Sequence, residues 1–430
     1  MLTLQYLQQN TEHIVERLKT RNQDYRELID QIKQLDEERR SRQQEVNDSQ
    51  AELNNLSKQI GQLFKEGRTD EANKVKEQNA KLKESVKEGQ QRLHAIEEEI
   101  RSLMVQIPNV PHETVEQGKG EEDNVLVRQN GQAPDLGQDA LPHWELAKKH
   151  DIIDFDLGNK ITGRGFPIYK NEGARLQRAM ISYFLDKARE QGYQEVQPPL
   201  MVNEDSAFAT GQLPDKEGQM YQVPIDNFYL IPTAEVPVTN IYRDSIVEEK
   251  DLPLKLTAYT PCFRREAGSW GKEVRGLNRV HQFDKVEIVQ IDHPERSYET
   301  LEAMTSYVES LIADMGMPYR VMRLCGGDLG FAAALTYDFE VYSSAQDKWL
   351  EVSSVSNFTS YQANRLKLRF RQEGKKKPQL AHTLNGSALA LPRLLAAMLE
   401  NYQEEDGIRV PEVLQKYTGF SSIKRKEEGR

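Results

Sequence analysis

The sequence is poor in the features that mark several large protein classes. Cys262 and Cys325 are its only cysteines among 430 residues and form no CxxC pair, which excludes a disulfide scaffold and a cysteine-based metal site. No apolar run reaches the roughly 18 residues that a membrane-spanning helix needs. Residues 1–19 have neither a basic start nor a small-residue cleavage site, so they do not form a signal peptide. These absences predict a cytoplasmic protein without a membrane anchor.

Glycine-rich phosphate motifs are absent as well. No GxxxxGK[ST] occurs, and no GxGxxG follows a strand and opens a helix. A net charge of −11 argues against a non-specific nucleic-acid coat, although it permits a local basic surface. If the protein binds a nucleotide, it must therefore hold it with arginines, a carboxylate-bound metal and an aromatic platform.

Residues 28–103, here called the arm, contain no proline and no tryptophan. Apolar residues recur there with a heptad period in two runs, separated by residues 65–71 with Gly67. The first run holds Leu28, Ile32, Leu35, Val46, Leu53, Leu56, Ile60 and Leu63, and the second holds Val75, Leu82, Val86, Leu93, Ile96, Ile100 and Leu103. Asn79 and Gly89 interrupt the second run. The pattern predicts an antiparallel helical hairpin. A helix of roughly 40 residues spans roughly 60 Å, so we expect the arm to project.

Charge is uneven along the arm. Residues 28–57 hold 4 basic and 7 acidic side chains, whereas residues 58–92 hold 9 basic and 6 acidic ones. The basic part includes Lys74, Lys76, Lys81 and Lys83. Two interpretations stay open: a solvated coiled-coil surface, or a finger that contacts nucleic-acid phosphates.

A polar linker follows the arm, since Pro108 and Pro111 break the helix. We expect an N-terminal domain at 1–103, a linker and entry to the core at 104–170, and a second domain at 171–430. Strand-like runs lie at 228–233, 254–263, 285–291, 336–343 and 348–357, and helical patterns lie at 171–191, 296–316 and 388–403. The order predicts an α+β fold with a mainly antiparallel sheet flanked by helices.

Several charged stretches stand out within this second domain. Arg264, Arg265 and Glu266 end one strand-like run, and a charged loop leads to a second run with Phe283 and Glu287. Paired arginines can grip phosphate. Phe283 is either a base-stacking platform or an ordinary core residue.

Three shorter patterns also indicate ligand chemistry. Gly386 and Ser387 precede a helical pattern with Arg393, and together they predict an anion site at a helix entrance. Glu351 and Ser354 offer hard oxygen ligands to Mg²⁺, although they could be plain strand residues. Thr233 and Glu235 lie two apart, so on an extended segment they would face one side and suit an ammonium group.

In combination these stretches resemble the bacterial-type seryl-tRNA synthetase family, in class II of the aminoacyl-tRNA synthetases, over essentially the whole chain. GYQEVQPPLMV resembles motif 1, with Pro199 at the dimer-interface proline. FRREAGS through HQFDKVE resembles motif 2, and LNGSALALPR, which ends in Arg393, resembles motif 3. TAE at 233–235 resembles the serine-specific loop. Neither HIGH nor KMSKS, the class I signatures, occurs.

The resemblance implies an enzyme that makes seryl-adenylate from L-serine and ATP with Mg²⁺ and transfers the seryl group to tRNA. The implied catalytic residues are Arg264 and Arg393. The implied ATP-binding residues are Arg264, Arg265, Glu266, Val280, Phe283, Glu351, Val352, Ser353, Ser354 and Arg393. Thr233, Ala234, Glu235, Glu287 and Ser387 are the implied serine-binding residues. Glu351 and Ser354 are the implied metal ligands.

The resemblance also implies a homodimer that binds the long variable arm of tRNA(Ser) through Lys74, Lys76, Lys81 and Lys83, and that charges tRNA(Sec) as well. The loop 267–279 would approach the tRNA acceptor end. Val274, Leu335 and GQLPDK at 211–216 depart from the family pattern. Two other functions stay open: an interaction protein with an inactive synthetase-like domain, and a ligase that loads an amino acid onto a carrier protein.

Overall fold

A computed structural model of the protein describes residues 1–137, 139–215, 218–266 and 275–425. Val274, residues 267–273 of the predicted loop, and Lys216 lie outside the described residues. The chain divides into two compact units, Met1–Lys19 with Gln23–Pro108, and Thr20–Asn22 with Asn109–Arg430. Within the described ranges, no helix combines the length and apolar character needed to cross a membrane.

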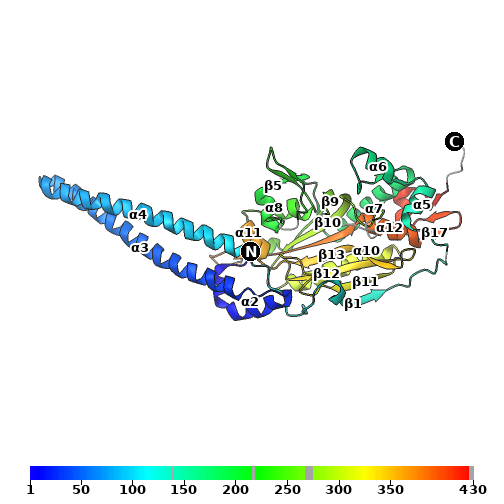
Figure 1. Ribbon diagram of the computed structural model, residues 1–430, viewed down its shortest axis with the longest axis horizontal. Coiled ribbons are helices and arrows are strands. Elements are labelled where there is room, and N and C mark those ends of the chain that lie inside the picture. Colours follow the sequence, from blue (N-terminus) through cyan, green and yellow to red (C-terminus); the bar gives the residue numbers. More distant parts are fainter. Residues whose placement is uncertain (138, 216–217, 267–274, 426–430) are drawn as a thin grey trace. The chain divides into compact units, whose positions relative to one another are not determined.

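The first unit is helical. The short helices α1 (Leu4–Gln9) and α2 (Thr11–Leu18) precede α3 (Arg26–Lys65) and α4 (Thr69–Met104), and a 3₁₀ turn, η1, covers Lys19–Arg21. Figure 1 shows α3 and α4 as long helices lying side by side. Gly67 in the turn between them has a φ of +76°, a conformation that glycine adopts without strain. The predicted helical hairpin is confirmed.

The predicted heptad positions form the contact between α3 and α4. All of them are buried or half-buried. The two interruptions also have structural reasons. Asn79 donates its Nδ2 to the carbonyl of Leu53 at 3.1 Å, across the helix pair. Gly89 leaves room for Val46, whose Cγ2 would lie 2.8 Å from a Cβ at position 89. The polar and small positions therefore belong to the seam.

One buried charge fastens α1 to α3. Asp36 is only 1% exposed and pairs with Arg39 and Arg40 at 2.7 and 2.8 Å, while Gln8 of α1 donates to the same carboxylate. A buried carboxylate is tolerated when its oxygens are paired in this way. The sequence pattern gave no indication of this contact.

The second unit is built on an eight-stranded sheet in the order β1-β11-β12-β13-β16-β10-β9-β4. All neighbouring pairs are antiparallel except β4 with β9, so the predicted mainly antiparallel sheet is confirmed. The strands are β1 (Val125–Asn130), β4 (Gln194–Glu195), β9 (Leu254–Phe263), β10 (Gln282–Asp292), β11 (Tyr319–Arg323), β12 (Leu335–Ser343), β13 (Lys348–Asn357) and β16 (His382–Ala390). Strand β1 lies in the segment expected to be a linker, which therefore contributes to the sheet.

Three long helices pack on this sheet. Helix α7 (Asn171–Glu190) contacts β9 and β10, α10 (Ser297–Asp314) contacts β13 and β16, and α12 (Leu391–Asn401) contacts β10, β12, β13 and β16. All three helices were predicted. The predicted helix entrance at Gly386 and Ser387 was wrong, because both residues lie in β16 and the helix begins at Leu391.

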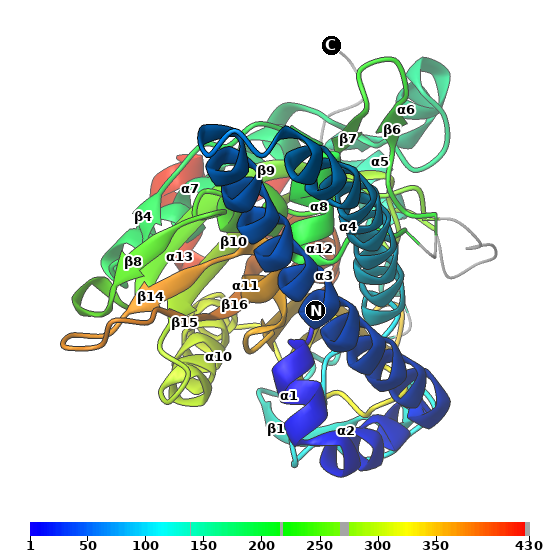
Figure 2. The ribbon, with the colours of Figure 1, turned by 90° about the vertical axis from the view of Figure 1, so that its left-hand side faces the viewer.

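Shorter elements complete the unit. The helices are α5 (His143–Lys149), α6 (Phe155–Ile161), α8 (Glu204–Thr210), α9 (Glu235–Asn240), α11 (Tyr361–Leu366) and α13 (Glu412–Thr418), with 3₁₀ turns η2 (Glu121–Asp123) and η3 (Glu249–Asp251). Small sheets are formed by β2 (Ile153–Asp154) and β3 (Ile168–Tyr169), by β5 (Met201–Asn203), β6 (Gln222–Val223) and β7 (Phe228–Leu230), by β8 (Ile246–Glu248), β14 (Arg369–Arg371) and β15 (Gln379–Leu380), and by β17 (Gln403–Glu404), β18 (Gly407–Arg409) and β19 (Ser422–Lys424). Figure 2 shows β8, β14 and β15 together at one side of the second unit.

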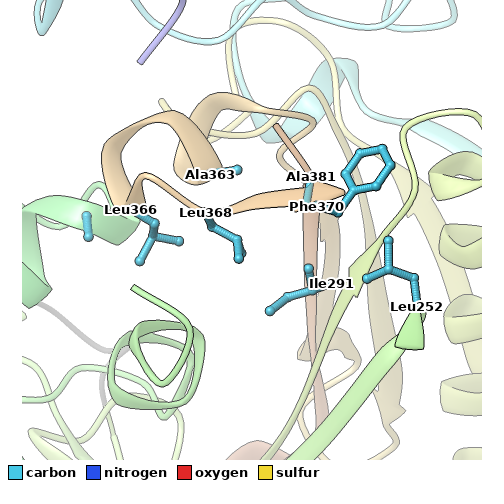
Figure 3. Close-up of a cluster of buried hydrophobic side chains, with 8 residues drawn as sticks. Leu252, Ile291, Ala363, Leu366, Leu368, Phe370 and Ala381 are labelled. Carbon is cyan, nitrogen blue, oxygen red and sulfur yellow. The ribbon is translucent and has the colours of Figure 1, made fainter. Parts of the chain in front are cut away.

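An apolar cluster holds α11 in place. Figure 3 shows Leu366, Leu368 and Phe370 packed with Ile291 at the end of β10 and with Leu252. Removing such side chains from water stabilises a fold by about 1.5–3 kcal/mol each. The cluster matters for the site because α11 also carries Gln362, which donates a hydrogen bond to Glu235 of the pocket described next.

Candidate active site

A cavity of about 530 Å³ opens in the second unit. Its lining comes from β10, β13, β16, the starts of α9 and α12, several residues between 212 and 233, and the stretches on either side of residues 267–274. Of the residues predicted to bind ATP or serine, it contains Thr233, Glu235, Arg264, Glu266, Val280, Phe283, Glu287, Glu351, Val352, Ser353, Ser354, Ser387 and Arg393. Ala234 and Arg265 are not among its lining residues.

Strand β10 supplies one row of pocket side chains. Phe283, Lys285 and Glu287 alternate along it, so they face the same side of the sheet. Glu287 is 2% exposed, and its Oε2 lies 2.7 Å from Lys285 Nζ and 3.3 Å from Thr233 Oγ1. Burial raises the pKa of Glu287, and the Lys285 ammonium opposes that shift. Ser387 lies opposite Glu287 on the neighbouring strand β16.

Lys285 was not among the predicted site residues. Its Nζ also donates to Thr233 Oγ1 at 2.8 Å and is almost fully buried. The signal was present in the sequence, since Lys285 stands midway between Phe283 and Glu287 on an alternating strand. A buried lysine needs a paired acid, and Glu287 provides it.

Glu235 is the second buried acid of the pocket. Burial and the nearby charge of Glu287 raise its pKa to about 7, and Gln362 donates to its Oε1 at 2.6 Å. The predicted extended arrangement of Thr233 and Glu235 was wrong, because Glu235 begins helix α9 and its N–H donates to Thr233 Oγ1 at 3.2 Å. The turn still directs both side chains into the pocket.

Arg264 directly follows β9 and lies beside the aromatic residue of the pocket. Its guanidinium lies 5.2 Å from the centre of the Phe283 ring, within the range of a cation–π contact. Glu266 forms an ion pair with Arg279 at 2.8 Å. Arg265 uses its backbone N–H to bond the carbonyl of Gln219 at 2.9 Å. Arg264 is therefore the arginine of this pair that reaches the cavity.

Glu351 and Ser354 lie side by side because β13 bulges. Glu351 pairs with Glu340 and Ser353 with Phe339, so Val352 is an extra residue in the strand. On a regular strand, two residues that are three positions apart point to opposite faces. The bulge instead brings Ser354 Oγ to 3.4 Å from Glu351 Oε1.

Arg393 joins this corner from the first turn of α12. Its Nη1 lies 3.5 Å from Glu351 Oε2, and its Nε donates to the carbonyl of Asn278 at 2.9 Å. The sequence predicted that Arg393 forms an anion site with Gly386 and Ser387 at a helix entrance. Its contacts come instead from strand β13 and from residues 275–280, here called the return segment.

The donor set fits a hard divalent cation. Beside Glu351 and Ser354 lies Asp338 of β12, whose Oδ1 is buried without a hydrogen-bond partner in the described structure. Burial and the Glu351 charge raise the pKa of Asp338 well above its usual value. No group of three or more His, Cys, Asp or Glu side chains around a possible metal position occurs among the described residues, so hydroxyl or ligand oxygens must complete any site.

The remaining predicted residues lie elsewhere. Lys74, Lys76, Lys81 and Lys83 are exposed on α4 in the first unit. Pro199 is exposed between β4 and β5 in the second unit.

Comparisons with known proteins identify the family of the chain. The family described as Seryl-tRNA synthetase N-terminal domain matches residues 1–111, and the family described as tRNA synthetase class II core domain (G, H, P, S and T) matches residues 221–402. A serine–tRNA ligase of Salinibacter ruber is 48% identical over 424 residues, which cover 98% of this chain and 99% of that protein.

Two solved structures are also similar to the chain. A seryl-tRNA synthetase from Pyrococcus horikoshii, complexed with ATP, gives a TM-score of 0.93 at 35% identity, covering 99% of this chain and 100% of the other. A cytoplasmic serine–tRNA ligase from Naegleria fowleri, in complex with AMP, gives 0.87 at 28% identity, with 99% of each chain covered. The chain therefore belongs to the seryl-tRNA synthetase family of class II aminoacyl-tRNA synthetases.

Proposed function

We propose that this protein is a serine–tRNA ligase that activates L-serine with ATP and transfers the seryl group to the 3′ end of tRNA(Ser), and of tRNA(Sec) as well. The observation that carries the proposal is the meeting of two buried acids, two arginines, an aromatic ring and a bulged acid–serine pair in one cavity. These groups match an amino acid, a nucleotide and its phosphates.

The serine end of the cavity lies around Glu287. Glu287, Glu235 and Thr233 offer oxygen acceptors for the ammonium group, with Ala234 in the same turn. Ser387, across the strand pair, lies near enough to Glu287 to contribute to a small polar pocket for the serine hydroxyl. Hydrogen bonds to that hydroxyl reject alanine more strongly than pocket size rejects an extra methyl group.

The ATP end lies between Phe283 and Arg393. Phe283 stacks the adenine, Arg264 binds the α-phosphate and the serine carboxylate, and Arg393 lies against the other face of the base. Val280, Val352 and Ser353 line the same space. Glu266 accepts a hydrogen bond from the adenine amino group, and Arg265 is the remaining ATP-binding residue. Glu266 must give up its ion pair with Arg279 to make this contact. The side chain of Arg279 is 42% exposed and that of Glu266 is 17% exposed.

Glu351 and Ser354 would hold Mg²⁺, and Asp338 stands beside them to balance its charge. A bound Mg²⁺ supplies charge neutralisation on the phosphate oxygens. The protein's own contribution is positioning. Arg264 orients the serine carboxylate for in-line attack on the α-phosphate, which forms seryl-adenylate and releases pyrophosphate, and Arg264 and Arg393 stabilise the negative charge of the transition state. In the second step the terminal tRNA hydroxyl attacks the acyl carbon and adenylate leaves.

Partner contacts complete the proposal. Lys74, Lys76, Lys81 and Lys83 contact phosphates of the long variable arm of the tRNA, as a basic helix surface can. A homodimer forms through the surface around Pro199, where Leu200, Met201 and Phe228 are exposed apolar side chains. We place the enzyme in the cytoplasm.

Amino-acid-dependent pyrophosphate exchange with each of the twenty amino acids tests the first step, and charging of tRNA(Ser) and tRNA(Sec) tests the second. We expect exchange with serine alone and charging of both tRNAs. Exchange without tRNA charging, together with loading of a carrier protein, would support a carrier-directed ligase. Absence of exchange with every amino acid would indicate an inactive domain.

A further inference from the structure

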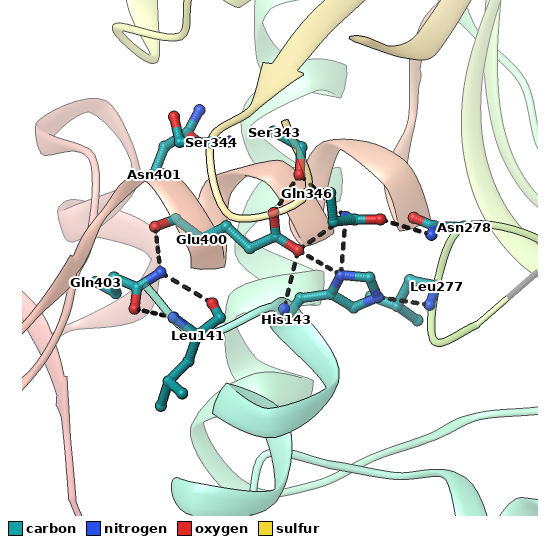
Figure 4. A network of polar contacts seen from close by, with 10 residues as sticks. All are labelled: Leu141, His143, Leu277, Asn278, Ser343, Ser344, Gln346, Glu400, Asn401 and Gln403. Atoms are coloured by element: carbon teal, nitrogen blue, oxygen red, sulfur yellow. Dashed lines mark hydrogen bonds and ion pairs between the residues drawn. The ribbon is translucent and has the colours of Figure 1, made fainter. Parts of the chain in front are cut away.

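A buried polar cluster ties helix α5 and helix α12 to the return segment (Figure 4). At its centre, Nδ1 of His143 lies 2.7 Å from Oε1 of Glu400, and both side chains are fully buried. Ser343, at the end of β12, and Gln346, in the β12–β13 turn, donate to the same carboxylate, Gln346 at 2.8 Å. The carboxylate oxygens are thus satisfied, as burial requires.

The hydrogen bonds of His143 define which of its ring nitrogens carries the proton. The backbone N–H of Leu277 donates to Nε2 of His143 at 2.9 Å, so Nε2 is the acceptor. Nδ1 then carries the proton and donates it to Glu400. The imidazole therefore connects the backbone of the return segment to a helix that begins beside the cavity.

Helix α5 makes two further contacts with the return segment. The guanidinium of Arg275 lies 4.7 Å from the ring centre of Trp144, and its Nη2 lies 3.2 Å from Glu145 Oε1. Gly276 has a φ of +67°, and a Cβ there would lie 2.2 Å from His143 Nε2. The close approach of the return segment to the imidazole therefore requires glycine at position 276.

The return segment in turn contacts Arg393. Asn278 donates its Nδ2 to Gln346 Oε1 at 2.7 Å, and its carbonyl accepts from Arg393 Nε at 2.9 Å. Leu277, Asn278 and Val280 line the cavity. A displacement of the backbone at Leu277 would therefore move the carbonyl that orients Arg393.

We propose that His143 is a positioning residue for ATP binding. Glu400 holds the imidazole, whose Nε2 accepts from Leu277 and so fixes residues 276–278, and the carbonyl of Asn278 then holds Arg393 against the nucleotide. The inference rests on the proposed role of Arg393 in binding ATP. It concerns residues that line no part of the cavity, since neither His143 nor Glu400 is among its lining residues.

Two substitutions of His143 separate its two contacts. Asparagine reproduces the position of Nδ1 but cannot reach Leu277, whereas glutamine places an acceptor near the position of Nε2. We expect His143→Asn to raise the KM for ATP about ten-fold in serine-dependent pyrophosphate exchange, with the KM for serine changed less than about two-fold. His143→Gln should recover most of the loss. Amide hydrogen exchange of residues 276–280 should rise in the asparagine variant.

The matched control is His150→Asn, because His150 is a buried histidine at the C-terminal end of the same helix. It should lower the melting temperature without changing the KM for ATP. If both variants alter the KM for ATP equally, the His143 cluster is only packing, and the inference is overturned.

Two more variants cover the remaining outcomes. If His143→Asn does not fold, Gln346→Ala breaks the contact to Asn278 from a half-buried turn, and an unchanged KM for ATP would overturn the inference. Arg393→Ala tests the role on which it rests. If that variant raises the KM for ATP while His143→Asn does not, only the positioning role of His143 fails. If neither does, the assignment of Arg393 fails too.

Discussion

At the residue scale, the Lys285–Glu287 ion pair is the buried charge pair of the proposed serine end. Replacing Glu287 by Ala leaves the Lys285 ammonium buried without its acid and removes an acceptor for the substrate ammonium. We expect the KM for serine in pyrophosphate exchange to rise roughly 10–100-fold, the effect of losing a charged hydrogen bond of about 1.5–3 kcal/mol. ATP binding should change little.

The double variant Glu287→Gln with Lys285→Met removes both buried charges together. It should fold better than either single variant, because neither charge is left unpaired. A serine KM that stays at the wild-type value in Glu287→Ala would show that the ammonium binds elsewhere.

The proposed role of Glu235 predicts that serine binding depends on pH. Its pKa is raised to about 7 in the serine-free pocket, first by burial and then by the Glu287 charge. The ionised carboxylate attracts the ammonium group, so serine and the proton compete. We expect kcat/KM for serine to rise with pH up to about 7 and then level off, since this ratio reports the free enzyme.

Glu235→Gln is the matched variant for this profile, because it keeps the size of the side chain and cannot ionise. Its kcat/KM should be low and should lose the rise near pH 7. A wild-type profile that is flat between pH 5.5 and 8.5 would contradict the assigned role of Glu235.

At the element scale, the bulge in β13 shapes the proposed Mg²⁺ site. It turns Glu351 and Ser354 to one side and leaves them near Asp338. Glu351→Ala should raise the Mg²⁺ concentration for half-maximal pyrophosphate exchange at least about ten-fold and reduce the first step, because phosphate charge goes unneutralised. Ser354→Ala should have a smaller effect, and removal of Mg²⁺ with a chelator should stop exchange.

Lys348→Ala is the control on the same strand, since lysine offers no oxygen ligand. A Mg²⁺ titration of Glu351→Ala that overlays that of wild type would place the metal elsewhere.

At the scale of the whole molecule, the arm and the cavity belong to different units, so the two reaction steps should separate. Deleting residues 49–62 and 72–85 removes whole heptads from α3 and α4 and keeps the turn at Gly67. Serine-dependent pyrophosphate exchange should stay within about two-fold of wild type, while kcat/KM for tRNA charging falls about 100-fold or more.

Reversing Lys74, Lys76, Lys81 and Lys83 to Glu should produce part of the same loss, and wild-type affinity for tRNA should fall with salt. Reversal of Lys375, Lys376 and Lys377, which are exposed in the second unit, is the control. Normal charging by the shortened protein would mean that the arm serves another interaction. Loss of both activities would mean that the arm is needed to fold the second unit.

The sequence by itself determined the features that depend on local periodicity. The heptads of the arm, the alternation of Phe283 and Glu287 on β10, and the long helices α7, α10 and α12 follow from which neighbouring residues are apolar. Most of the proposed pocket residues could be named from the resemblance to the seryl-tRNA synthetase family, because that family's motifs are short stretches whose members are close in the chain.

Tertiary structure decided the contacts between distant residues and the local geometry that those contacts impose. Gly386 and Ser387 became strand residues because β10 and β13 pair with β16 on both sides, which no helical pattern nearby could reveal. The bulge at Val352 depends on register with β12. His143 and Glu400 are 257 residues apart, so only folding brings them together. Periodicity records which face of an element is buried, whereas register and long-range pairing record what lies against it.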